Sequence, residues 1–133
     1  MRLGSAALAV VLGLALSTCS SPAGPIGGTL LVTLTGVGAA DRALLIEIVG
    51  SDTSAAIDTV GAAPGESYVV FAQRVTPARW RAIVTGALAN GAVARVAIAD
   101  KSKSGLYSAR ILDVADASFA ELAPGARTLS VAP

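Results

Sequence analysis

The sequence predicts an all-β fold, an antiparallel β-sandwich of about eight short strands. From Thr29 onward, apolar and β-branched residues alternate with polar ones in short runs, which is the two-residue period of a strand with one face in a core. Clusters of Gly, Pro, Asp, Asn and Ser separate these runs at spacings of about 8 to 14 residues. Almost no stretch keeps a helical period, so we expect a single β-domain over residues 29–133.

The first half of this domain is expected to supply four strands, at residues 29–35, 42–49, 55–60 and 68–75. Glycine-containing segments separate them, and Pro64-Gly65 is the strongest turn signal. Glu47 is expected to face outward. The alternate apolar positions expected to face the core in the first two strands are Leu30, Val32, Leu34, Leu44, Ile46 and Ile48.

The second half is expected to supply four more strands, at residues 79–85, 92–99, 106–114 and 127–131. Thr76-Pro77 forces a break, so the strands on either side of it are expected to form a hairpin. Asn90-Gly91 and Pro124-Gly125 are turn signals before the sixth and eighth strands. The outward-facing residues of the sixth strand are expected to be Val93, Arg95 and Ala97.

Two segments of the second half lack strand patterning. Residues 100–105 form a polar loop, in which Lys101 and Lys103 are expected to be solubilising charges. Residues 115–122 are the one place for a short helix or an irregular crossing, with Phe119 and Leu122 expected in the core.

The start of the chain predicts export. Arg2 precedes an apolar run at residues 3–16, which at about 14 residues is shorter than the roughly 20 needed to span a bilayer as a helix. A basic start, a short apolar run and small residues are typical of a helical secretory signal peptide. We therefore expect residues 1–18 to be a signal peptide that is removed from an exported protein.

The tetrapeptide Leu16-Ser17-Thr18-Cys19 resembles the lipobox of bacterial lipoproteins. Thr18 departs from the Gly, Ala or Ser usual there. The resemblance implies that Cys19 carries a lipid, that residues 19–28 (CSSPAGPIGG) form a flexible tether, and that the protein is lipid-anchored in the cell envelope, at the outer membrane if the host has one. Two alternatives stay open, namely ordinary secretion with cleavage around residues 17–21 and a free thiol, and an uncleaved signal anchor.

Composition excludes several classes of function. The chain has 10 Lys and Arg against 9 Asp and Glu, which gives no electrostatic basis for nucleic-acid binding. Its single cysteine, Cys19, allows no internal disulfide, and it has no histidine, the commonest general base and metal ligand. The acidic residues Asp100, Asp113 and Asp116 do not match a calcium loop. We expect no enzymatic activity, no metal site and no cofactor.

The most suggestive binding constellation surrounds the Thr76-Pro77 break. It consists of Arg74, Arg79, Trp80 and Arg81, and guanidinium groups beside an indole are suited to an anionic or sugar-like ligand. The opposing interpretation is structural. Because Trp80 alternates with Arg79 and Arg81 along a strand, the indole is expected to point into the core while the arginines lie in solvent.

Four segments together resemble cohesin-like and related immunoglobulin-like sandwich domains of exported bacterial proteins. They are GTLLVTLTG, NGAVARVAIAD, GLYSARILDVADASF and RTLSVA. The same resemblance suggests small lipoproteins of uncharacterised function that hold one such domain. Cohesins bind dockerin modules, but no dockerin-contact residue carries over to this sequence.

These observations favour a membrane-anchored envelope lipoprotein that acts as a non-catalytic protein-interaction or structural module. Its expected partners are the membrane, through the lipid on Cys19, and an envelope protein or polysaccharide. The alternative is a β-sandwich that binds a carbohydrate or an anionic ligand through Trp80 and the neighbouring arginines.

Overall fold

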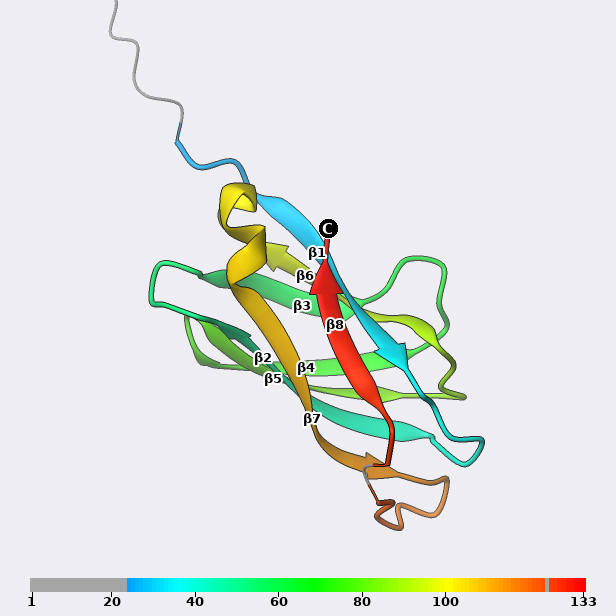
Figure 1. The fold of residues 1–133 in the computed structure, drawn as a ribbon. Helices are drawn as coiled ribbons and strands as arrows, with labels where there is room; N and C mark the ends of the chain where they lie inside the picture. Colours follow the sequence, from blue (N-terminus) through cyan, green and yellow to red (C-terminus); the bar gives the residue numbers. More distant parts are fainter. Residues whose placement is uncertain (1–23, 124) are drawn as a thin grey trace, which may run out of the picture.

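The structure is a computed structural model that describes residues 24–123 and 125–133 (Figure 1). The described residues form strands joined by short loops, with one 3-10 helix. The elements are β1 (Gly28–Thr35), β2 (Ala43–Gly50), β3 (Ile57–Ala62), β4 (Val69–Thr76), β5 (Arg79–Thr85), β6 (Gly91–Ile98), η1 (Lys101–Leu106), β7 (Tyr107–Ala115) and β8 (Thr128–Ala132). The expected signal peptide, Cys19 and residues 20–23 of the expected tether lie outside the described residues, whereas residues 24–28 of the tether are described and Gly28 begins β1.

The strands form two four-stranded antiparallel sheets. Sheet A has the strand order β3-β6-β1-β8, and sheet B has the order β4-β5-β2-β7. Figure 1 shows the sheets as two layers. The expected all-β sandwich of eight strands is confirmed, and so is the hairpin of β4 and β5 across Thr76-Pro77.

The core lies between the inner faces of the two sheets. In β1 and β2 the alternate apolar residues expected to face inward are at most 1% exposed: Leu30, Val32, Leu34, Leu44, Ile46 and Ile48. This burial is the main force holding the sheets together, at about 25 cal/mol for each Å² of apolar surface removed from water.

The prediction that Val93 faces outward is wrong, because a β-bulge interrupts β6. Val32 of β1 pairs with Ala94 and the next residue, Thr33, pairs with Ala92, so Val93 is left out of the ladder. The extra residue shifts the alternation by one position. Val93 is consequently fully buried, whereas Arg95 is exposed as expected.

The segment before β8 forms the irregular crossing, which is one of its two expected forms. Residues 115–122 form no helix; the chain turns at Asp116, and Ala115 then bridges to Glu121. Leu122 packs against the core as expected. Phe119 does not, since its side chain is 83% exposed. The expected turn at Pro124-Gly125 includes Pro124, which lies outside the described residues.

The polar loop expected at residues 100–105 contains the short helix η1. The Asp100 side chain caps this helix by accepting a hydrogen bond from the Ser102 backbone N–H at 3.0 Å. The Lys101 N–H donates to the Ile26 carbonyl at 2.8 Å, which fixes η1 beside the start of β1.

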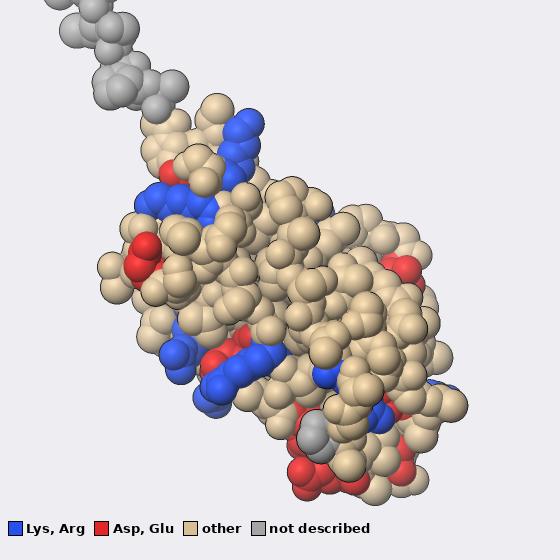
Figure 2. All heavy atoms as spheres, in the orientation of Figure 1, with Lys and Arg blue, Asp and Glu red and all other residues tan. Residues whose placement is uncertain are grey.

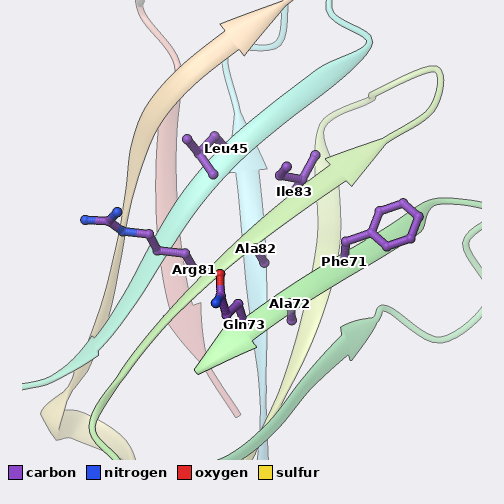
Figure 3. A pocket seen from close by; sticks show the side chains of 7 residues that line it. All are labelled: Leu45, Phe71, Ala72, Gln73, Arg81, Ala82 and Ile83. Carbon is purple, nitrogen blue, oxygen red and sulfur yellow. The ribbon is translucent and has the colours of Figure 1, made fainter. Parts of the chain in front are cut away.

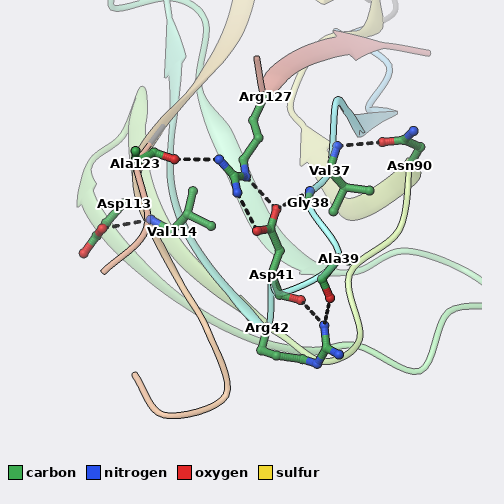
Figure 4. A network of polar contacts seen from close by, with 10 residues as sticks. All are labelled: Val37, Gly38, Ala39, Asp41, Arg42, Asn90, Asp113, Val114, Ala123 and Arg127. Carbon is green, nitrogen blue, oxygen red and sulfur yellow. Dashed lines mark hydrogen bonds and ion pairs between the residues drawn. The ribbon is translucent and has the colours of Figure 1, made fainter. Parts of the chain in front are cut away.

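A buried ion pair closes the opposite end of the sandwich (Figure 4). Asp41, in the β1–β2 connection, is fully buried, and both its carboxylate oxygens accept hydrogen bonds from Arg127 at 2.6 Å. Arg127 also donates to the Ala123 carbonyl. The hydrogen bonds from Arg127 hold the pKa of Asp41 below its ordinary value, against the opposing effect of burial. The pair thereby joins the β1–β2 connection to the segment that leads into β8.

Candidate functional site

The outer face of sheet B combines a buried acidic side chain, the arginines that cover it and large apolar side chains exposed to water. The strand register places its side chains in rows that cross the sheet. One row is polar and consists of Gln73, Arg81, Glu47 and Arg110. The adjacent row consists of Phe71, Ile83, Leu45 and Asp113, of which three are apolar.

Glu47 is the centre of the polar row. Its position on the outward side of β2 agrees with the expectation, but its side chain is only 1% exposed because arginines cover it. Arg110 donates from Nε at 3.0 Å and from Nη2 at 2.8 Å to Oε1, while Arg81 Nε donates to Oε2 at 3.2 Å. Arg79 Nη1 lies 3.9 Å from the same Oε2. We call Arg79, Arg81 and Arg110 the arginine cluster.

The cluster keeps Glu47 ionised. Burial alone raises the pKa of a carboxyl group, but the hydrogen bonds from Arg110 and Arg81 outweigh burial, so the pKa of Glu47 lies below its ordinary value. The three arginine side chains remain 45%, 52% and 66% exposed. The result is a solvent-facing set of three cations fixed around one buried anion.

The apolar row forms a groove next to this cluster. A hollow of about 310 Å³ lies between Phe71 and Ile83 on one side and Gln73 and Arg81 on the other (Figure 3). Figure 3 shows Phe71 and Arg81 pointing to opposite sides of this hollow. Phe71 is 66% exposed and Ile83 is 44% exposed, so large apolar groups lie open to water here.

A second hollow of about 250 Å³ continues the first one across Leu45 and Ile83 toward Phe119. Phe119 has a φ of 61°, which lies in the left-handed region that residues other than glycine and asparagine rarely adopt. Asp116 imposes this turn, since its Oδ1 accepts hydrogen bonds from the N–H groups of Ser118 and Ala120. The turn thus holds an aromatic ring in solvent at the end of the apolar surface.

The structure brings together only part of the expected binding constellation. Arg79 and Arg81 both lie in the arginine cluster. Trp80 lies on the other side of the sheet and packs against the core, which confirms the structural interpretation of its indole. Arg74 is the register partner of Trp80 on β4 and is exposed at the edge of the sheet, away from the cluster.

Arg110 and Glu47 are the site residues that the sequence interpretation missed. Arg110 lies 63 residues from Glu47 along the chain, and only the pairing of β2 with β7 brings them together. The sequence offers one signal for this site. The alternation of side chains along β2, β5 and β7 places one acidic residue and several arginines at strand positions that face solvent. That signal does not reveal which strands are neighbours.

The indole Nε1 of Trp80 is buried and has no hydrogen-bond partner among the described residues. Lys103 donates to the Ser54 carbonyl at 3.4 Å, and Lys101 is exposed at the surface of η1.

In residues 24–123 and 125–133, no three His, Cys, Asp or Glu side chains are grouped to hold a metal ion. The same part of the chain contains no helix that is long and apolar enough to cross a membrane.

Comparison of the chain with protein-family models, with curated proteins and with solved structures finds no match.

Proposed function

We propose that this chain is a lipid-anchored envelope protein whose β-sandwich acts as a non-catalytic protein-interaction module. In this proposal residues 1–18 are removed, Cys19 carries the lipid, and residues 19–28 connect it to the cohesin-like or immunoglobulin-like domain at residues 29–133. The support for the anchor is the basic start, the short apolar run and the lipobox-like tetrapeptide.

The observation that carries the interaction role is the apolar surface on the outer face of sheet B. Soluble domains rarely leave neighbouring large apolar side chains open to water without a binding role. Here Phe71, Ile83 and Phe119 are 66%, 44% and 83% exposed and line two adjoining hollows. The surface also reaches an edge, because β4 pairs with β5 alone among the described strands, and an edge strand offers unpaired backbone groups to a partner.

The direction of the strands supports this role. β1 starts beside η1, whereas Phe119 lies at the opposite end of the sandwich, beyond the end of β7 (Figure 1). A tether attached before β1 therefore leaves the Phe119 end pointing away from the membrane. A partner in the envelope reaches the apolar surface without displacing lipid.

The interaction role is tested by capture from envelope extracts of the source organism with the tagged, detergent-solubilised protein. We expect a defined protein to be retained by the unaltered chain and lost with Phe71→Ser. Ile26→Ser is the matched control, because Ile26 is 60% exposed but lies before β1, outside sheet B. Equal retention by both variants, or retention of polysaccharide only, contradicts the proposed surface.

The anchor is tested separately. We expect Cys19→Ala to abolish incorporation of a labelled fatty acid into the protein, because the thiol that carries the acyl chains of the proposed anchor is removed. A Thr18→Ala variant, which restores the usual lipobox residue, is expected to incorporate the labelled fatty acid. Equal incorporation of the labelled fatty acid by the unaltered chain and by the Cys19→Ala variant contradicts lipid attachment at this residue.

A further inference from the structure

We infer that the outer face of sheet B recognises an acidic side chain of a partner protein together with a neighbouring apolar side chain. The carboxylate binds the arginine cluster, and the apolar group enters the groove beside Phe71 and Ile83. This inference rests on the proposed function and specifies the chemistry of the partner.

The arginine cluster carries a surplus of positive charge. The arginine cluster holds three guanidinium groups, and the one carboxylate bonded to them is Glu47. Glu47 balances one of these charges and leaves a surplus of two. In the described part of the chain, Arg79, Arg81 and Arg110 form no ion pair with a second acid. A surplus of exposed positive charge favours an acidic partner and opposes a second copy of the same surface.

The arginine cluster also has hydrogen-bond donors that Glu47 does not use. Arg81 uses only Nε on Glu47, and Arg110 uses Nε and Nη2 on a single oxygen. The Nη groups of Arg81 and the Nη1 group of Arg110 make no hydrogen bond within the described residues and are available to a ligand. Guanidinium donors arranged in a fixed fork match a carboxylate. Because buried Glu47 already holds both side chains in place, little conformational freedom is left to lose on binding.

The polar row and the apolar row lie next to each other on the outer face of sheet B. Neighbouring rows on one face of a sheet are two residues apart, which is about 7 Å. Arg81 lines the same hollow as Phe71 and Ile83 (Figure 3). A carboxylate and an apolar group on adjacent side chains of a partner therefore reach the cluster and the groove at the same time.

The test uses the detergent-solubilised protein and the capped dipeptide acetyl-Asp-Phe-amide, followed by NMR of the arginine Nε–H groups. We expect the probe to shift the Nε–H signals of Arg81 and Arg110 and to leave Arg95, which is exposed on sheet A, unmoved. The twin acetyl-Asn-Phe-amide is expected to bind about tenfold more weakly, because hydrogen bonds to a charged acceptor are about twice as strong.

Variants separate the two halves of the site. Arg110→Gln is expected to abolish the preference for the Asp probe, and Arg95→Gln is the matched control. Phe71→Ser removes no member of an ion pair. We expect it to weaken binding of acetyl-Asp-Phe-amide several-fold and to leave unchanged the shifts that acetate causes in the arginine Nε–H signals. Two results overturn the inference. One is that acetyl-Asp-Phe-amide binds no more tightly than acetate, and the other is that the Asn and Asp dipeptides bind with equal affinity.

The capture experiment distinguishes this inference from the proposed function. If Phe71→Ser abolishes capture of the envelope partner and Arg110→Gln has no effect on it, the surface is an interaction site but acidic recognition is wrong. If neither variant affects capture, the proposed surface itself fails. Thermal unfolding of each variant establishes that it is folded under the conditions of the assay.

Discussion

Asp41 and Glu47 are the two buried acidic side chains of the described residues, and both are neutralised by arginines far away in sequence. Arg127 binds Asp41 through two hydrogen bonds, so its loss leaves a buried carboxylate without its main partner. We expect Arg127→Gln to lower the free energy of unfolding by about 3 kcal/mol, as measured by urea denaturation. Arg95→Gln, at an exposed position, is the control, and equal destabilisation by both variants contradicts a specific role for the ion pair.

The same ion pair predicts a pH dependence. The pKa of Asp41 in the folded protein lies below its ordinary value of 3.8 because Arg127 donates hydrogen bonds to the carboxylate. Its contribution to stability is therefore complete above pH 3.8 and is lost as the pH falls from there through the lower folded pKa, since only the unfolded chain binds the proton in that window. Urea titrations at several acidic pH values should show this loss, and Arg127→Gln should reduce it.

Phe119 stores backbone strain in an exposed turn. Its left-handed φ of 61° costs a residue with a Cβ about 1 kcal/mol, and its ring gains little burial in return. Phe119→Asn introduces a polar residue that tolerates this conformation, so we expect a gain of about 0.5 kcal/mol in the free energy of unfolding together with weaker capture of the partner. A loss of stability would indicate that the ring packs against the domain.

At the scale of the strands, the bulge in β6 decides which residues are core residues. Val93→Ala is expected to cost about 2 kcal/mol, because it removes two methyl groups from a fully buried side chain. Arg95→Ala, two positions later on the exposed face, should change the free energy of unfolding by less than about 0.5 kcal/mol. Urea denaturation of the two variants checks the bulge, since uninterrupted alternation would place both side chains in solvent.

All eight strands could be predicted from the sequence to within two residues at each end. Alternation succeeds where a strand has one buried face and a regular ladder, as in β1 and β2. It fails at Val93, where a bulge adds a residue, and at Phe119, where a turn built on Asp116 outweighs the tendency of an aromatic ring to be buried. Both wrong predictions, for Val93 and for Phe119, have the same cause. The positions of the bulge and of the turn depend on backbone hydrogen bonds, which the pattern of apolar residues does not reveal.

The candidate site was less predictable, because it depends on strand order. Arg79 and Arg81 were recognised as neighbours along β5, and the inward direction of Trp80 followed from alternation. Arg110 joins them only because β2 separates β5 from β7 in sheet B. Strand order is set by long-range packing, and one sequence carries no direct signal of it.

At the scale of the whole molecule, contacts between distant segments dominate. β1 pairs with both β6 and β8, so the two ends of the domain must meet before sheet A is complete. Such non-local pairing slows folding. We expect refolding on a time scale of milliseconds to seconds, followed by stopped-flow fluorescence of Trp80, the one tryptophan in the chain. Microsecond refolding would contradict a fold limited by long-range pairing.

Charge is also distributed unevenly over the molecule. Figure 2 shows acidic side chains gathered at the end where β7 leads toward β8, whereas basic and acidic side chains lie together around η1. The acidic group where β7 leads toward β8 includes Asp113, Asp116 and Glu121.

The antiparallel pairing of β1 with β8 places Leu31 opposite Ala132, so the chain enters and leaves the domain at the same end. This arrangement has a mechanical consequence. A force applied between the start of β1 and the end of β8 would peel the two strands apart one hydrogen bond at a time. A force between the tether and a partner held near Phe119 runs along the strands instead and strains many ladder bonds together, because these bonds lie perpendicular to the strands. In the proposed function, this geometry resists tension between the lipid anchor and a bound partner.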